Sequence, residues 1–202
     1  MSTIQDELYG VKKGYIDTKV DGAQEKISQQ LYKLITESKK DYNEIVLICI
    51  GTDRSAGDCF APMLGTFLSE REELKGKCKI YGSLQNPVHA KNLEDTLNTI
   101  DAKNSLIIAI DACLGSTGNL QKICIANGTL TPGAAFNKEL PSIGDISIAG
   151  IVNISGAFEF MVLQNTRIGI VYEMVRNLEV GIISAINKLS VRKMIINDKV
   201  AV

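Results

Sequence analysis

Residues 45–50 read IVLICI and lead directly into the polar loop GTDRSAGD at residues 51–58. A second apolar run, LIIAI at residues 106–110, stops in the same way at Asp111. Short runs rich in β-branched residues are typical of strands that are covered on both faces. Because the carboxyl ends of parallel strands meet at one edge of a sheet, we expect Asp58 and Asp111 to lie over the same crevice.

Two carboxylates held close together cannot both ionise cheaply, so one of them tends to keep a proton. Asp58 precedes an expected helix, where Asp is a favoured N-cap and the helix dipole lowers the pKa of a carboxyl. We therefore expect Asp58 to be the ionised partner and Asp111 the protonated one. Such a pair provides a base and an acid from one residue type.

Helical and strand patterns alternate along the rest of the chain. We expect strands at residues 44–50, 77–81, 106–110, 121–126 and 146–152, and helices at residues 21–39, from 60 onward, 89–100 and 166–189. This alternation predicts an α/β fold with three layers, α/β/α, around a mostly parallel sheet. Residues 1–20 show no periodicity and are expected to form a flexible N-terminal arm, followed by a single domain at residues 21–202.

The composition argues against several classes of protein. The 202 residues include 22 basic and 23 acidic side chains, so no strong field attracts nucleic acid or an anionic membrane. No apolar run approaches the roughly 20 residues that cross a bilayer, and the polar start does not resemble a signal peptide. Five cysteines without a C-x-x-C pair fit a reducing compartment, so we expect a cytoplasmic protein with no direct nucleic-acid or membrane partner.

The 51–58 loop is similar to a phosphate-binding loop only in its glycines, because Asp58 stands where a Walker loop has lysine. No G-x-G-x-x-G follows either strand, and we expect no cofactor. Arg54 could orient a substrate carbonyl through its several donors. Backbone N–H groups of this loop and of the 115–118 turn are candidates for stabilising negative charge on a substrate.

His89 is the single histidine of the chain and follows an expected strand end. Its simplest role is structural, but it could also project into the crevice. With Asp53, Asp58 and Asp111 it would then form a carboxylate–histidine set of the kind that suits a divalent transition metal. We expect no bound metal, and a metal-dependent hydrolase remains an alternative.

Four segments together resemble the germination protease of spore-forming bacteria, which cleaves the small acid-soluble proteins that coat spore DNA. They are Gly-x6-Asp-x3-Pro at residues 51–62, IIAIDA at 107–112, TPG with Asn137 at 131–137, and IAGIV at 148–152. The compact length and the segment GSLQNPVHAKNL, residues 82–93, resemble the YyaC-type sporulation proteins still more closely.

The resemblance implies the three-layer, phosphorylase/hydrolase-like fold of the germination and hydrogenase maturation proteases, with Asp58 and Asp111 in the catalytic positions. It also implies a peptide or small protein as substrate, such as a small acid-soluble spore protein, and a place in the forespore or mother cell. One departure is that no histidine follows Asp111, where the maturation endopeptidases have a nickel ligand.

We expect nine residues to bind substrate or support the pair: Gly51, Asp53, Arg54, Gly57, His89, Gly115, Pro132, Gly133 and Asn137. A second interpretation is a non-catalytic sporulation factor that retains the cleft to bind a peptide or partner. The apolar segment at residues 168–186 could be buried between layers or could form the contact of a homo-oligomer.

Overall fold

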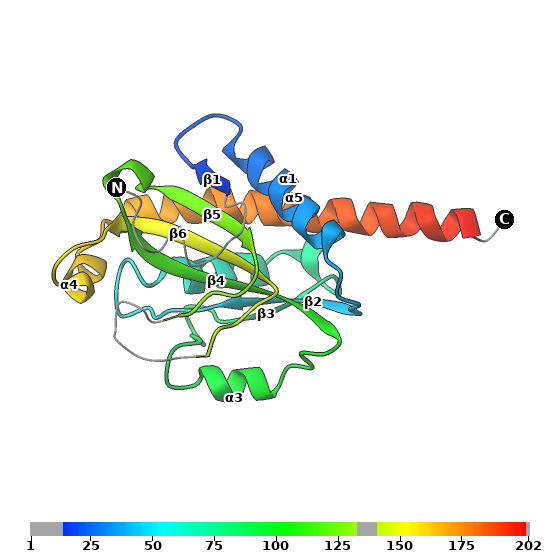
Figure 1. Cartoon of the computed structure of the whole chain (residues 1–202), viewed down its shortest axis with the longest axis horizontal. Coiled ribbons are helices and arrows are strands. Elements are labelled where there is room, and N and C mark those ends of the chain that lie inside the picture. Colours follow the sequence, from blue (N-terminus) through cyan, green and yellow to red (C-terminus); the bar gives the residue numbers. More distant parts are fainter. Residues whose placement is uncertain (1–13, 133–140, 201–202) are drawn as a thin grey trace.

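The structure is a computed structural model that describes residues 14–132 and 141–200, with side chains described as far as Val191. This part of the chain holds a six-stranded sheet in the order β1-β5-β6-β4-β2-β3 (Figure 1). Strands β6, β4, β2 and β3 are parallel to one another. On the other side of β6, β5 pairs antiparallel with β6, and β1 pairs antiparallel with β5. The strands are β1 (Gly14–Asp17), β2 (Glu44–Cys49), β3 (Lys79–Tyr81), β4 (Ser105–Gly115), β5 (Lys122–Asn127) and β6 (Ile146–Ile154).

Helices cover both faces of this sheet, as the alternating apolar sequence of β2 requires. Ile45, Leu47 and Cys49 belong to the larger core, which is shared with α1 (Ala23–Glu37), α2 (Phe60–Ser69) and α5 (Ile168–Val200). Val46 and Ile48 face the smaller core, which is shared with α3 (Leu93–Asn98). The expected three-layer α/β/α fold is therefore confirmed, with an antiparallel extension that makes the sheet mixed.

Two expected boundaries at the start of elements were wrong. Residues 14–17 are not part of an arm, because they form β1 and pair with β5, with Ile16 opposite Ile123; residues 1–13 lie outside the described residues. The helix expected from residue 89 begins only at Leu93, because the N–H groups of Asn92 and Leu93 both donate to the carbonyl of His89 and close a turn there.

The chain beyond β6 also differs from the expected single helix. A short helix, α4 (Glu159–Gln164), precedes α5, which extends well past the body of the protein in Figure 1. Burial explains much of the apolar character of residues 168–186, since Val171, Val175, Leu178 and Ile182 are fully buried in the larger core. A homo-oligomer stays a prediction.

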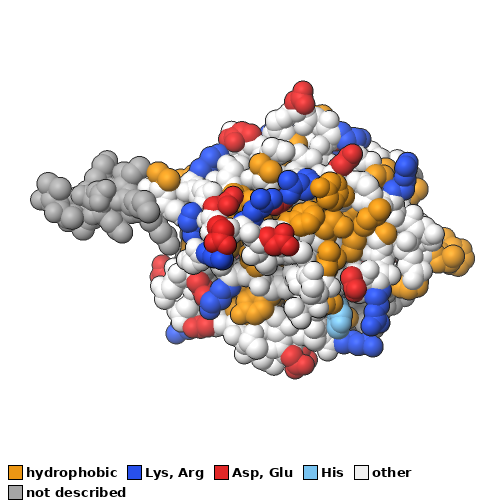
Figure 2. Space-filling model, turned by 180° about the vertical axis from the view of Figure 1, so that it is seen from behind, with side chains coloured by type: hydrophobic (Ala, Val, Ile, Leu, Met, Phe, Trp, Pro, Cys, Tyr) orange, Lys and Arg blue, Asp and Glu red, His pale blue; other side chains and the backbone are white. Residues whose placement is uncertain are grey.

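Hydrophobic side chains also gather on the outer surface, on the face shown in Figure 2. The large exposed ones near α4 and the start of α5 are Phe158, Phe160, Met161, Ile168 and Tyr172. Within the described residues no helix combines the length and the apolar character that a membrane span requires.

A buried ion pair holds α5 against the segment that follows α2. Glu179 is fully buried, and its Oε1 accepts a hydrogen bond of 2.6 Å from Nε of Arg71. Arg176 donates to the second carboxylate oxygen and also lies 5.6 Å from the centroid of the Phe67 ring. Because both oxygens of the buried carboxylate have cationic donors, this charge is satisfied inside the core.

We predict that Arg71→Met lowers the free energy of unfolding by about 1–3 kcal/mol, because Glu179 then stays buried with one cationic partner. Urea unfolding followed by circular dichroism measures the change. Lys75→Met is the matched control: its partner Glu72 is exposed, so we expect a loss below about 0.5 kcal/mol. Equal losses in the two variants would show that the buried pair has no special importance.

Candidate active site

The site begins where β2 leaves the sheet and β4 continues. The last paired residues of the two strands are Cys49 and Ile110, and the N–H of Ile50 makes a final hydrogen bond of 2.8 Å to the carbonyl of Ile110. Strand β4 runs on to Gly115 because its other neighbour, β6, still pairs with it. The expectation that the strand ends at Asp111 was therefore wrong: Asp111 lies inside β4, opposite Ala149 of β6.

The 51–58 loop folds back tightly at the point where β2 ends. Gly51 donates its N–H to the carbonyl of Val88 (2.8 Å), and Thr52 donates to the carbonyl of Asp58 (3.3 Å). Gly51 has φ +147°, and a Cβ atom there would lie 2.1 Å from the carbonyl oxygen of Asp58. Only glycine permits this approach. Gly51 thus joins the start of the loop both to Asp58 and to the residue that precedes His89.

Asp58 is buried, with 9% of its surface exposed. The expected N-cap role was wrong, because the N-cap of α2 is Cys59 and the helix begins at Phe60. Burial raises the pKa of the Asp58 carboxyl to about 6, although the backbone N–H of Thr52 and the nearby His89 lower it in part. The expected downward shift was therefore wrong in sign, since desolvation outweighs these favourable contacts.

Asp111 is partly accessible as a residue, but its carboxyl group is desolvated, and this raises its pKa well above the usual value. The charge of Asp58 raises the pKa of Asp111 further, which requires the two carboxyls to be near one another. One stabilising contact opposes these effects: Oδ1 of Asp111 accepts a hydrogen bond of 2.8 Å from the N–H of Ala112. Asp111 is the member of the pair that holds a proton more firmly.

His89 lies in the turn before α3 and is half-buried. Figure 2 shows the pale blue histidine at the molecular surface, beside Lys or Arg side chains. Its Nδ1 accepts a hydrogen bond of 3.3 Å from the N–H of Lys91, and this assigns the proton of the neutral ring to Nε2. In its cationic form the ring attracts the charge of Asp58, and the backbone bonds of Gly51 to Val88 and of Thr52 to Asp58 hold the two segments together.

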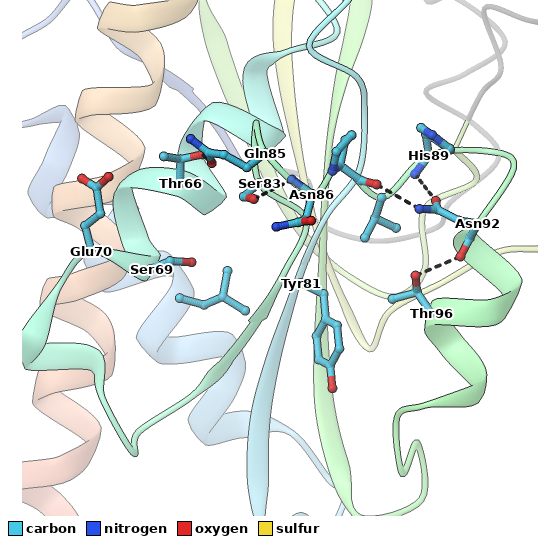
Figure 3. A pocket seen from close by; sticks show the side chains of 14 residues that line it. Thr66, Ser69, Glu70, Tyr81, Ser83, Gln85, Asn86, His89, Asn92 and Thr96 are labelled. Atoms are coloured by element: carbon cyan, nitrogen blue, oxygen red, sulfur yellow. Dashed lines mark hydrogen bonds between the residues drawn. The ribbon is translucent and has the colours of Figure 1, made fainter.

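A cavity of about 830 Å³ opens beside His89 (Figure 3). Thr66 and Ser69 of α2 and Glu70, which directly follows this helix, lie on one side, and His89 and Thr96 lie on the other. The end of β3 and the turn after it, residues 80–83, lie between these two sides. Asp58 and Asp111 do not line this cavity, so His89 is the residue that links it to the carboxyl pair.

Several expected supporting residues have other roles. Gly57 packs against α4, where its N–H donates to the carbonyl of Leu163 (2.9 Å). Asp53 and Arg54 are exposed. Gly115 ends β4 and packs against Ile151, and its carbonyl accepts a hydrogen bond from the N–H of Ser155 (2.8 Å).

Of the expected Pro-Gly loop, Pro132 is buried. Gly133 and Asn137 lie outside the described residues. The structure thus brings Asp58, Asp111, Gly51 and His89 together, whereas the N–H of Gly57 and the carbonyl of Gly115 form their hydrogen bonds with other segments.

One residue of the loop, Ser55, was missed by the sequence analysis. The hydroxyl of Ser55 is buried and has no hydrogen-bond partner within the described part of the chain. Burial, with the charge of Asp58, raises the pKa of the Cys59 thiol to about 11, so this cysteine stays a thiol at neutral pH. A serine in a polar loop is usually exposed, so the sequence contained no signal for Ser55.

The metal-dependent alternative lacks a ligand set in this region. Within residues 14–132 and 141–191, no three His, Cys, Asp or Glu side chains are grouped so that they could hold a metal ion. The expected set of His89, Asp53, Asp58 and Asp111 therefore does not fit a metal centre.

The carboxyl pair should destabilise the fold above pH 6. The folded state raises the pKa of Asp58 from 3.8 to about 6, so the folded protein binds more protons than the unfolded chain between these values, and stability falls as the pH rises through them. We predict that Asp58→Asn raises the free energy of unfolding by about 2 kcal/mol at pH 7.5, with a gain that shrinks toward pH 4. Urea unfolding across this pH range measures it. A variant that is less stable at pH 7.5 would contradict the raised pKa.

The close approach at Gly51 also gives a test. We predict that Gly51→Ala shifts the Asp58 backbone and lowers the free energy of unfolding by about 1–3 kcal/mol, because its Cβ has no space and its φ is unfavourable. Gly169→Ala is the control, since a Cβ there meets nothing within 4 Å in α5 and should be neutral or stabilising. Thermal unfolding of both variants separates a site-specific effect from a general effect of replacing glycine.

Comparisons with known proteins place this chain in a family. Residues 15–181 match the model of the family described as "Protein of unknown function (DUF1256)". The chain is 42% identical over 159 residues to "Uncharacterized protein YyaC" of Bacillus subtilis (strain 168), and the match covers 77% of each protein. The crystal structure of a NiFe hydrogenase maturation protease, HycI from Thermococcus kodakarensis KOD1, is similar with a TM-score of 0.47 and 17% identity, over 78% of this chain and 98% of that one. The expected kinship with YyaC-type proteins is confirmed, and the chain belongs to the family described as DUF1256.

Proposed function

We propose that the protein is a peptide hydrolase in which Asp58 and Asp111 act as an acid–base pair. The observation that supports this proposal is the electrostatic coupling of two desolvated carboxyls that come from separate elements. A buried carboxylate that only stabilises a fold normally has cationic partners, as Glu179 has here. Carboxyls whose pKa values stay raised because their partners offset only part of the desolvation are typical of functional sites.

The two carboxyls have different roles in this proposal. Asp58 has a pKa of about 6, so it is mostly ionised at neutral pH and takes a proton from a water molecule. Asp111 keeps its proton and donates a hydrogen bond to the carbonyl oxygen of the peptide bond. The water oxygen bonds to the carbonyl carbon, and Asp58 then returns its proton to the leaving amine as the C–N bond breaks.

His89 supports this division of roles. Its interaction with Asp58 favours the ionised form of that carboxyl, whereas the backbone N–H of Ala112 is the contact that favours ionisation of Asp111. Because Nδ1 accepts a hydrogen bond from the N–H of Lys91, the neutral imidazole has Nε2–H as its donor. His89 therefore acts as a positioning residue between the pair and the cavity.

The proposed substrate is a peptide or a small protein. The cavity beside His89 is lined mainly by neutral polar side chains and backbone, which suits a polypeptide better than a highly charged ligand. The resemblance to the germination protease points to small acid-soluble spore proteins, and hence to the cytoplasm of a sporulating cell. The substrate and the cell type are both part of the proposal.

A non-catalytic binding protein is the second candidate. It is favoured by the position of the cavity, whose lining includes His89 but neither carboxyl of the pair. In that case the protein would bind a peptide or partner without turnover. The two candidates differ in whether a bound peptide is cleaved, and the same preparation can test both.

We predict that the purified protein cleaves a small acid-soluble spore protein, or members of a peptide library, with kcat/KM rising through an apparent pKa of about 6. The reason is that Asp58 must be ionised to act as the base. Asp58→Asn and Asp111→Asn should each lower kcat/KM by on the order of 10²-fold or more. Mass spectrometry of the products and a pH series measure both effects.

The control for this experiment is Asp41→Asn, an exposed aspartate at a distance along the chain from the site, which should leave cleavage unchanged. Cleavage that persists in both site variants would refute the acid–base pair. Peptide binding by the wild-type protein without any turnover would select the binding protein instead.

A further inference from the structure

We propose that the open edge of β3 binds an extended peptide, which adds to the sheet as a further strand and is led past His89 toward the carboxyl pair. The proposal rests on the proposed function for its substrate, because it specifies how a peptide hydrolase of this fold would hold its chain. Binding at the edge can nevertheless be measured without any cleavage.

Strand β3 is the last strand on its side of the sheet. Its three residues pair with β2 on one side, with Ile80 opposite Leu47 and Tyr81 opposite Ile48. An edge strand leaves N–H and C=O groups on its outer side that can pair with an extended chain. Addition of a strand to such an edge is a recurring mode of peptide recognition.

The cavity lies along this edge. Its lining includes Thr66 and Ser69 of α2 and Thr96 of α3, with Ile80 and Tyr81 of β3 between the two helices (Figure 3). Helices α2 and α3 pack on opposite faces of the sheet, so a cavity lined by both must pass around the edge of the sheet. Its volume of about 830 Å³ is that of a ligand site, which typically measures roughly 300–1,000 Å³.

The end of β3 is held rigidly, as a template for pairing must be. Gly82 has φ +89°, and a Cβ atom there would lie 2.0 Å from the carbonyl oxygen of Cys49. A Cβ on Gly65 of α2 would in turn lie 1.8 Å from the carbonyl oxygen of Gly82. The backbones of β2, α2 and the turn after β3 are therefore in direct contact, and this fixes the edge before any peptide arrives.

The edge leads to the carboxyl pair through the segment that follows β3. After its turn, this segment returns so that Val88 forms a parallel bridge with Ile50, in line with the end of β2. The next residue, His89, both lines the cavity and interacts with Asp58. We call the cavity along this edge the groove. A chain paired with β3 would thus pass the imidazole of His89 at the end of the groove that is nearer to the carboxyl pair.

The charges along the groove favour a particular peptide. Glu70 provides a carboxylate in the lining at the end of α2, away from His89 (Figure 3). A basic side chain at the corresponding end of the peptide would be attracted, and an acidic one would be repelled. We therefore expect an extended peptide with Lys or Arg at that end.

Binding is tested with the double variant Asp58→Asn/Asp111→Asn, so that cleavage does not interfere. The probe is a positional-scanning library of acetylated and amidated ten-residue peptides, with Lys or Glu fixed at each position in turn, followed by fluorescence anisotropy. The tightest peptide is then resynthesised with one N-methyl group at a time. In a strand added to an edge, alternate N–H groups face the neighbouring strand. Within the short stretch that pairs with the three residues of β3, affinity should therefore fall about tenfold at alternate residues and little between them.

Variants of the groove provide an independent measurement. Thr96→Arg and Ser69→Arg place bulk in the groove from opposite sides and should weaken binding about tenfold. Thr99→Arg is the matched control, since Thr99 lies three residues after Thr96 and outside the lining, and it should change affinity less than about twofold. Circular dichroism establishes that each variant is folded, and the N-methyl pattern needs no protein variant at all.

The outcomes separate the two proposals. Absence of binding by the whole library, N-methyl effects without alternation, or binding unchanged in folded Thr96→Arg and Ser69→Arg proteins would each overturn edge pairing. Alternation together with sensitivity to the groove variants would support it. If such a peptide binds and the wild-type protein never cleaves it, the proposed hydrolase function fails while the docking edge stands.

Discussion

The site depends on the unequal lengths of two neighbouring strands. Strand β2 ends opposite Ile110, whereas β4 continues to Gly115 because β6 still pairs with it. Asp111 is therefore held in a regular strand while its other side is open to the 51–58 loop. If β4 ended with β2, Asp111 would lie in a loop, and a carboxyl that must hold a proton in one place would be less well positioned. Gly51 completes the arrangement, since its missing side chain lets Asp58 fold back over the end of β2.

Two buried acidic groups in this protein show how partners decide between stability and chemistry. Glu179 is fully buried, but Arg71 and Arg176 supply donors to both of its oxygens, so its charge is compensated. Asp58 is nearly as buried, but it lies near the carboxyl of Asp111, and His89 offsets only part of its desolvation. The first arrangement holds α5 against the rest of the fold. In the second, the free-energy cost of desolvating the carboxyls is not fully offset. Local conflicts of this kind are concentrated at functional sites in proteins that are otherwise well satisfied.

The pattern of the sequence was sufficient for the layers of the fold and for the expectation that Asp58 and Asp111 lie near one another. Their catalytic role stays a proposal. The pattern failed where contacts distant in the chain override a local rule. Asp before a helix predicts a cap and a lowered pKa, but the packing of the loop buries Asp58, and desolvation reverses the shift. The apolar run before Asp111 shows where β4 starts, but its end is set by pairing with β6. The groove along β3 was not foreseen because its walls, α2 and α3, become neighbours of the same edge only through folding.

The unequal surroundings of Asp58 and Asp111 favour one of the two carboxyls as the holder of a shared proton. Repulsion between the carboxyls disfavours two charges, and desolvation disfavours even one. The contacts that stabilise a charge are unequal, since Thr52 and His89 act on Asp58 and Ala112 acts on Asp111. In the proposed mechanism the proton therefore stays on Asp111, inside β4, and the charge is carried by Asp58, which interacts with His89 at the groove. A peptide in that groove would displace water from around the imidazole. The interaction of His89 with Asp58 would then strengthen, because the local dielectric constant falls. Filling the groove would thus reinforce the same distribution of charge that the acid–base pair requires.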